Sequence, residues 1–399
     1  MPPISPTEYP IEYSWPDITP YAEGNTGVPY VHTFDSGKPG RHVMVNAVTH
    51  GNELCGAVAV DLLFKLRIRP RQGKLTLGFA NYEAYNRFDP KDPWITRQID
   101  ENFNRLWVEG RLDGSEDSIE LRRAREMRPI FDHVDDLLDI HSMSTASPPL
   151  TLFWGNQKEQ QAYLRTGYPT YGIGGPVHDA GKRIIEYTPF NDTANDKTAQ
   201  LVECGQHWAD YAGKAAIDTT FRFLVAMGVI DQADADPHLH ERNPPAPTVL
   251  EVTDGVMTKT DNFAFVQPYI GLETIAESGT VIAYDGDEAI TTPGDAEPPR
   301  RQGSTRAPPG AQGVGERLRA RCRPHRGRYQ PLVRPRHTGR HAMDGRGGRL
   351  LRDHGCCGAG VASVGHEHAE HHGLAQRSGP GPDYRADPGD GWPVALPHT

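Results

Sequence analysis

Two kinds of apolar pattern alternate along the first 230 residues of the chain. The runs at 42–48, 136–140 and 199–204 are short and mostly apolar, as buried strands are, whereas 56–68 and 213–227 have the length and apolar spacing of helices. Strands that alternate with helices are typical of an α/β domain whose sheet is largely parallel. The pattern therefore predicts a mixed, mostly parallel sheet flanked by helices.

A different pattern follows towards residue 290. Segment 231–247 is rich in Asp, Pro and His, as linkers often are, and short β-like runs separated by glycine turns fill 248–290. We therefore expect an α/β domain over residues 1–235 and a partial β-rich domain over 248–293.

The composition changes abruptly after residue 293. Residues 294–399 contain no Lys, Ile, Phe or Asn, and their 17 Arg and 10 acidic side chains give a net charge of +7. Without apolar periodicity such a segment cannot build a core, so we expect a disordered tail that truncates the β-rich domain. Out-of-frame translation of GC-rich DNA is the simplest explanation of this composition, and a genuine basic tail is the alternative.

Charge and cysteine usage limit the partners and the compartment. Residues 1–293 carry 25 basic and 42 acidic side chains, a balance that disfavours nucleic-acid binding. No apolar run approaches the ~18 residues of a membrane span, and the first residues lack the pattern of a signal peptide. The five cysteines have no framework spacing, which indicates free thiols. We expect a cytoplasmic protein with no nucleic-acid and no membrane partner.

Three residues have the chemistry and spacing of a catalytic zinc site. His50 and Glu53 lie three residues apart after the strand-like run 43–48, and His141 follows the run 134–140. Two imidazoles and one carboxylate leave a fourth tetrahedral position open, and strand ends are where open α/β sheets place their sites. We therefore predict one Zn²⁺ per chain.

Other interpretations of these residues stay open at this point. A His-x-x-Glu pair occurs by chance, and a histidine at a strand end is often a hydrogen-bonded structural residue. A competing metal cluster is the His-rich segment 366–372, although it lacks a strand framework that would fix ligand geometry.

Five segments resemble, in order, motifs of the succinylglutamate desuccinylase/aspartoacylase family, which is related to the zinc carboxypeptidases. They are Thr49-His50-Gly51-Asn52-Glu53, Asn81-Tyr82-Glu83-Ala84, Asn102-Phe103-Asn104-Arg105, Asp139-Ile140-His141-Ser142 and Leu201-Val202-Glu203-Cys204-Gly205. The resemblance covers about residues 40–290 and implies a zinc carboxypeptidase-like fold, with residues 1–235 as the zinc hydrolase catalytic domain. Asn102 stands where the family often has Asp, which puts a carboxylate role there in doubt.

Amide hydrolysis at such a site needs a base, and Glu203 is the candidate. A carboxylate in the apolar run 201–204 is costly to bury unless it has a role or a partner. The alternative is a glutamate on the solvent side of an edge strand.

The resemblance implies further roles. Arg97 would stabilise the tetrahedral intermediate, and Asn104 and Arg105 would bind a substrate carboxylate, which a guanidinium matches in shape. Independently of the resemblance, Asp139 stands two residues before His141 and would orient this ligand. The alternative for the two arginines is a solvated face.

The expected function is zinc-dependent hydrolysis of the amide bond of a small N-acyl amino acid. Two alternatives remain: a zinc carboxypeptidase acting on peptides, and a non-catalytic binding protein of the same fold. A lid formed by 151–187 would favour small substrates, but the sequence does not settle whether one exists. The acyl group, the amine and the oligomeric state are not readable from the sequence.

Overall fold

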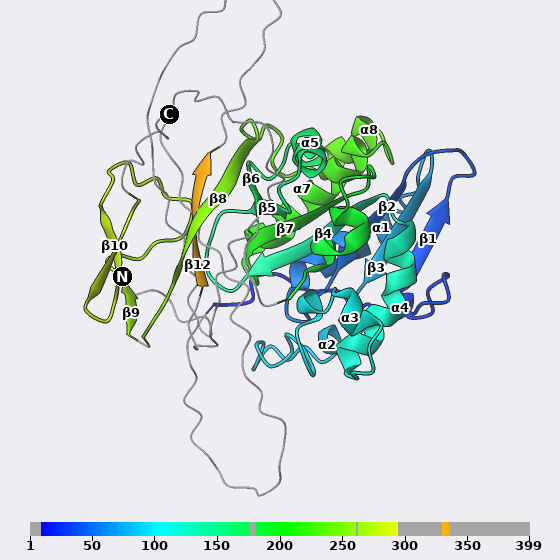
Figure 1. The fold of residues 1–399 in the computed structure, drawn as a ribbon. Helices are drawn as coiled ribbons and strands as arrows, with labels where there is room; N and C mark the ends of the chain where they lie inside the picture. The colour runs from blue at the N-terminus through cyan, green and yellow to red at the C-terminus, as the bar shows by residue number, and fades with distance from the viewer. Residues whose placement is uncertain (1–8, 176–180, 261, 294–328, 336–399) are drawn as a thin grey trace, which may run out of the picture.

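The computed structural model describes residues 9–175, 181–260, 262–293 and 329–335, and its main feature is one nine-stranded sheet (Figure 1). The strands of this sheet are β1 (Val31–Asp35), β2 (His42–Ala47), β3 (Lys74–Phe79), β4 (Asp136–Met143), β5 (Leu150–Phe153), β6 (Tyr171–Gly174), β7 (Thr198–Gln206), β8 (Thr248–Met257) and β12 (Tyr329–Pro335). The α-helices are α1 (Leu54–Lys65), α2 (Tyr82–Tyr85), α3 (Glu109–Leu112), α4 (Ile119–His133), α5 (Gln157–Thr166), α6 (Thr188–Asn191), α7 (Asp210–Ala226) and α8 (Gln232–Ala235).

The sheet is mixed and mostly parallel, as the alternating pattern predicted. Its strand order is β1-β3-β2-β4-β7-β5-β6-β8-β12, and β2 pairs in parallel with β3 and β4, β4 with β7, β5 with β6, and β6 with β8. The central strands β4 and β7 are buried along their whole length, which their nearly continuous apolar runs allow. Because β2, β4 and β7 run in one direction, their carboxyl ends meet at the same edge of the sheet.

Helices cover both faces of this sheet. On one face α1 and α7 pack together, and Leu63 and Leu224 belong to the same buried core (Figure 1). On the other face α4 contributes Met127 and Phe131 to a second core. Apolar burial on both faces stabilises the central strands that carry the site, at roughly 25 cal/mol for each Å² of apolar surface removed from water.

The predicted second β-rich region divides into two parts. Strand β8 extends the large sheet by pairing with β6, whereas β9 (Phe263–Phe265), β10 (Val281–Asp285) and β11 (Glu288–Thr291) form a separate three-stranded antiparallel sheet. The expected boundary between 235 and 248 thus precedes a strand that is hydrogen-bonded to the first domain. The division into domains at 1–235, 248–293 and 294–399 stays a prediction.

Most of the expected disordered tail, including the His-rich segment 366–372, lies outside the described residues. The exception is β12, which pairs antiparallel with β8 from Tyr329 opposite Met257 to Pro335 opposite Leu250. Among the helices of the described part of the chain, none has both the length and the apolar character that crossing a bilayer requires.

Most of segment 151–187 forms strands of the large sheet and a helix that packs on it. It contains most of β5, all of α5 and all of β6, and the two strands pair with each other inside the large sheet. Residues 176–180 lie outside the described residues. Over 151–174 the segment is therefore part of the sheet and its covering helix, and not the lid that the sequence left open.

Candidate metal centre and active site

The turn between β2 and α1 carries two of the three predicted metal ligands. Val48 adopts a positive φ of 53°, a conformation that β-branched residues rarely tolerate, directly after the strand. Such an outlier persists only where the surrounding structure enforces it, and outliers of this kind gather at functional sites. Glu53 precedes α1, but its carboxylate makes no capping bond to the helix and is directed towards the histidines instead.

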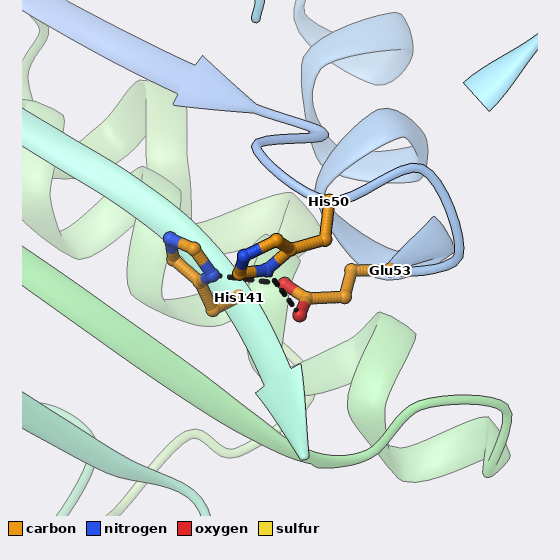
Figure 2. A group of neighbouring side chains, drawn as sticks. All are labelled: His50, Glu53 and His141. Carbon is orange, nitrogen blue, oxygen red and sulfur yellow. Dashed lines mark hydrogen bonds and ion pairs between the residues drawn. The ribbon is translucent and has the colours of Figure 1, made fainter. Parts of the chain in front are cut away.

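His50, Glu53 and His141 converge on one buried point (Figure 2). Oε1 of Glu53 lies 2.7 Å from Nδ1 of His50, and Oε2 of Glu53 lies 2.9 Å from Nδ1 of His141. One candidate ligand atom from each side chain lies within 4.8 Å of the other two. The three predicted residues therefore meet in space. This group, called the metal group below, could hold a metal ion.

The outer nitrogen of each histidine has its own partner. Nε2 of His141 lies 2.7 Å from Oδ2 of Asp139, and Nε2 of His50 lies 3.0 Å from Oδ1 of Asn102. Because these oxygens accept hydrogen bonds, each Nε2 can carry a proton when a cation binds, which would leave each Nδ1 lone pair for that cation. The motif of the resembled family often has Asp at position 102. Asn102 instead offers its amide oxygen to His50 as a hydrogen-bond acceptor.

Asp139 is itself fixed by two donors. Its Oδ1 accepts hydrogen bonds from Nδ2 of Asn46 and Oγ1 of Thr49, both at 2.8 Å. These contacts tie the end of β2 to β4 and leave Oδ2 for His141. The expected contact between Asp139 and the candidate ligand His141 is present, and such contacts are usual around metal-binding histidines.

The charges within this group are strongly coupled. Burial, reinforced by the Arg97 cation, lowers the pKa of His50 to about 4. Burial also opposes a charged His141, but the carboxylates of Asp139 and Glu53 outweigh it and raise that pKa well above its usual value. The imidazoles of His50 and His141 in turn overcome burial and hold the pKa of Glu53 well below its usual range. A cation that binds here would displace the His141 proton, so metal binding should release protons.

Arg97 reaches the metal group from the segment after α2. Its Nη1 donates to Oε1 of Glu53 at 3.1 Å, and its Nη2 lies 3.0 Å from Nε2 of His50. Nε2 of His50 can accept from Arg97 when the His50 proton lies on Nδ1 and is donated to Glu53. With a cation on Nδ1, Nε2 would carry the proton and donate to Asn102 instead. The predicted arginine is therefore part of this cluster.

Glu203 lies beside the metal group on the neighbouring strand. It is the register partner of His141 in the parallel pair β4–β7, and its side chain is buried. Within the described part of the chain its Oε2 has no hydrogen-bond partner. Burial raises its pKa well above the usual value, although the nearby His141 opposes this. A buried carboxyl with a raised pKa and one oxygen without a hydrogen bond among the described residues is a candidate for acid–base chemistry.

A β-bulge directly after Glu203 directs another histidine that the sequence analysis missed. The register shifts between His141 and Met143, and Gly205 in the bulge has a φ of 100°. Nδ1 of His207 then lies 2.8 Å from Oγ of Ser142, whose backbone N–H lies 3.3 Å from Oε2 of Glu53. Bulges near active sites commonly redirect side chains in this way. No motif in the sequence marks His207.

The predicted substrate-binding residues form a second cationic region. Arg105 donates from Nη1 to the Asn104 carbonyl at 2.9 Å, and Oδ1 of Asn104 accepts from the Ile184 N–H at 2.9 Å. The adjacent Arg183, which the sequence analysis also missed, is buried and donates to Glu186, while its Nη2 has no partner among the described residues. The chain segments of Arg105 and Arg183, about eighty residues apart in sequence, are thus in contact, and guanidiniums are common ligands of anions.

The match to a known family covers the metal group. Residues 39–169 match the model of the succinylglutamate desuccinylase/aspartoacylase catalytic domain. This segment of the chain is therefore similar to that catalytic domain. It includes His50, Glu53 and His141 as well as Arg97, so the resemblance predicted from the motifs is confirmed there. Glu203 lies beyond the matched segment, and the match says nothing of it.

The chain also aligns with solved structures from Ruegeria pomeroyi, Rhodobacter sphaeroides and Shewanella frigidimarina. The ectoine utilization protein of Ruegeria pomeroyi is 17% identical, with 65% of this chain and 79% of that chain covered and a TM-score of 0.46. The succinylglutamate desuccinylase/aspartoacylase of Rhodobacter sphaeroides is 16% identical, with 64% and 77% covered and a TM-score of 0.46. A protein described as a putative member of the same family from Shewanella frigidimarina is 18% identical, with 66% and 85% covered and a TM-score of 0.46. No curated protein matches the chain.

Proposed function

We propose that this protein is a zinc-dependent deacylase that hydrolyses the amide bond of a small N-acyl amino acid. The observation that carries the proposal is the buried group His50, Glu53 and His141. Two imidazole nitrogens and one carboxylate are a donor set of catalytic zinc sites, which keep one position open. The hydrogen bonds of both outer nitrogens favour the tautomer that a metal ligand needs. Zinc, when bound, lowers the pKa of a water molecule towards ~7 and polarises the substrate carbonyl.

Glu203 is the proposed general base and acid. It would accept a proton from the attacking water and pass it to the leaving amine, because an amine expelled without a proton is a poor leaving group. Its position opposite His141 and its raised pKa support this role. Arg97, beside Glu53, would donate to the oxyanion of the tetrahedral intermediate.

Arg105 and Asn104, joined by Arg183, are proposed to bind a carboxylate of the substrate. The planar guanidinium offers two parallel N–H donors that match a carboxylate. Glu186 already forms an ion pair with Arg183, with Oε2 2.6 Å from Nε. The family name, which refers to succinyl and aspartoacyl substrates, supports an N-acyl amino acid. A cytoplasmic location, expected from the cysteine content, stays a prediction.

The proposed reaction can be tested directly. Purified protein loaded with zinc is given a panel of N-acyl amino acids, and release of the free amine is measured before and after chelation. We expect turnover of at least one compound, its loss with chelator and its return with zinc. Amine release from peptides alone would favour a carboxypeptidase, and no turnover of either class by zinc-loaded protein would contradict an enzymatic role.

A further inference from the structure

A buried carboxylate outside the proposed catalytic group accepts hydrogen bonds from four N–H donors. Glu120 in the first turn of α4 is fully buried. Its Oε1 accepts from the Ile99 N–H at 2.6 Å and from Nδ2 of Asn81 at 3.1 Å. Its Oε2 accepts from the backbone N–H groups of Asp100 and Glu101 at 3.0 and 3.2 Å. The fourfold contact fixes three consecutive backbone amides to one side chain.

The backbone amides that bind Glu120 lie between two residues that contact the metal group, Arg97 and Asn102. Arg97, which donates to Glu53, precedes them by two residues, and Asn102, which accepts from His50, follows Glu101 directly. Segment 97–102 is not part of a regular helix or strand, so side-chain contacts must set its path. Gly51 adds a bond from its N–H to the Arg97 carbonyl at 2.9 Å.

We propose that Glu120 is a positioning residue that holds the 97–102 segment, and with it Arg97 and Asn102, against the metal group. This inference rests on the function proposed above. It also gives a role to the Asn81-x-x-Ala84 motif. Oδ1 of Asn81 accepts from the Ala84 N–H at 3.4 Å, and its Nδ2 donates to Glu120, so the start of α2 is tied to the same carboxylate.

Only a carboxylate satisfies all four donors. An ionised glutamate accepts through both oxygens, whereas the amide of glutamine has one oxygen and presents an NH₂ group to the other pair of N–H groups. In Glu120→Gln one pair of donors therefore loses its acceptor and faces another donor. The variant keeps the size and shape of the side chain, so its effect reports the lost acceptor and the lost charge.

The first test measures the contact without using activity. We expect amide hydrogen exchange in Glu120→Gln to accelerate at two or more of residues 99–101, while exchange in β4 and α1 and the zinc content stay at wild-type level. The matched control is Glu126→Gln on the same helix, whose carboxylate is 51% exposed and forms an ion pair with Arg123. Unchanged exchange at 99–101 would overturn the inference whatever the enzyme does.

The second test asks whether Glu120 acts through Arg97. We expect Glu120→Gln to lower kcat about 10- to 100-fold per zinc-loaded protein, and to cost less than about threefold more in an Arg97→Ala background, since residues that act as a unit are not additive. A general loss of stability would multiply the two effects, and that result would contradict positioning. If the glutamine variant does not fold, Glu120→Asp, which keeps the charge, is run through the same cycle with the same criterion.

Failure of the proposed function and failure of the Glu120 inference give different results. A wild-type protein that releases no amine from any substrate refutes the proposed function, and the exchange experiment still decides whether Glu120 holds the segment. A wild-type enzyme with normal turnover whose Glu120→Gln variant keeps its kcat refutes the inference alone.

Discussion

The histidines of the metal group each have one nitrogen turned to the shared carboxylate and one nitrogen already bonded to an oxygen. Asp139 and Asn102 supply those oxygens, so both rings are already oriented for a cation that would replace the proton on Nδ1. The difference between the two histidines is itself informative. Against the effect of burial, the carboxylates of Asp139 and Glu53 raise the pKa of His141, whereas burial, reinforced by the Arg97 cation, lowers the pKa of His50.

Replacing Glu203 by glutamine should separate metal binding from catalysis. The variant should keep its zinc, because His50, Glu53 and His141 are intact, and should lose at least ~10²-fold in kcat, the lower end of general acid–base contributions. Steady-state kinetics on metal-analysed protein checks both. Near-normal turnover would remove Glu203 from the mechanism.

The pH dependence of the wild type follows from the raised pKa of Glu203. A base must be deprotonated, so kcat/KM should rise with pH through that pKa, and the acid limb should lie above the ordinary value of 4.5. The limb should be absent from the residual activity of Glu203→Gln. If the variant still loses kcat/KM at low pH over the same range, a group other than Glu203 causes the pH dependence.

Arg105→Lys should weaken substrate binding more than turnover. Lysine keeps the charge but cannot make two parallel hydrogen bonds to a carboxylate, so KM should rise by about tenfold. Kinetics with an N-acyl amino acid and with its amide give the comparison. If blocking the substrate carboxylate costs the wild type nothing, this role is wrong.

At the scale of a single element, the β-bulge in β7 contains a glycine that the path of the strand requires. A Cβ at Gly205 would lie 2.2 Å from Cε2 of Tyr211, and the φ of 100° is strained for any other residue. The glycine lets β7 pass from Glu203 to His207 with a shift of register.

We therefore predict that Gly205→Ala destabilises the fold by about 2 kcal/mol or more. The control is Gly213→Ala inside α7, where a new Cβ would come no nearer than 4.0 Å to Tyr13. Alanine favours a helix over glycine by ~1 kcal/mol, so this variant should be neutral or slightly more stable. Denaturant unfolding compares the two. Equal stabilities would show that the bulge does not need glycine.

Elements with strong local patterns were predictable from the sequence, and those without them were not. The apolar runs behind β2, β4 and β7 and the spacing of α1 and α7 placed these elements within a few residues. Strands of four residues such as β5 and β6 offer too short a pattern. The antiparallel pairing of β5 with β7 depends on contacts distant in sequence, which periodicity cannot reveal.

The same distinction holds for the site. His50, Glu53 and His141 follow predicted strands and carry metal-ligand chemistry, so residue type and position were enough to propose them. His207, Arg183 and Glu120 acquire their interest only from partners brought together by folding, such as Ser142 for His207 and the 99–101 amides for Glu120. No local pattern announces such a contact.

At the scale of the whole molecule, several strands of the large sheet separate the candidate site from β12. In the large sheet β7, β5, β6 and β8 lie between β4 and β12. A chain that ends at residue 293 would lose β12 but no residue of the metal group, Arg97 or Glu203. It would expose the edge of β8, and exposed edges promote aggregation.

We predict that the chain ending at 293 binds zinc and turns over substrate like the full-length protein, with lower solubility. Limited proteolysis of the full chain should leave a fragment that ends near this residue. The informative comparison is a chain that ends at 340 and so retains β12, which should be the more soluble of the two. A protease-resistant C-terminal fragment that unfolds cooperatively would contradict the prediction that 294–399 forms no compact domain.

The most direct test of the central claim is the metal content of purified wild-type protein beside that of His141→Ala. His141 is the ligand that β4 contributes to a group otherwise supplied by the β2–α1 turn, so its loss should open the site without disturbing that turn. We expect about one zinc per wild-type chain and a small fraction of that in the variant, with both proteins folded. Zinc at wild-type level in folded His141→Ala would show that the metal is held elsewhere.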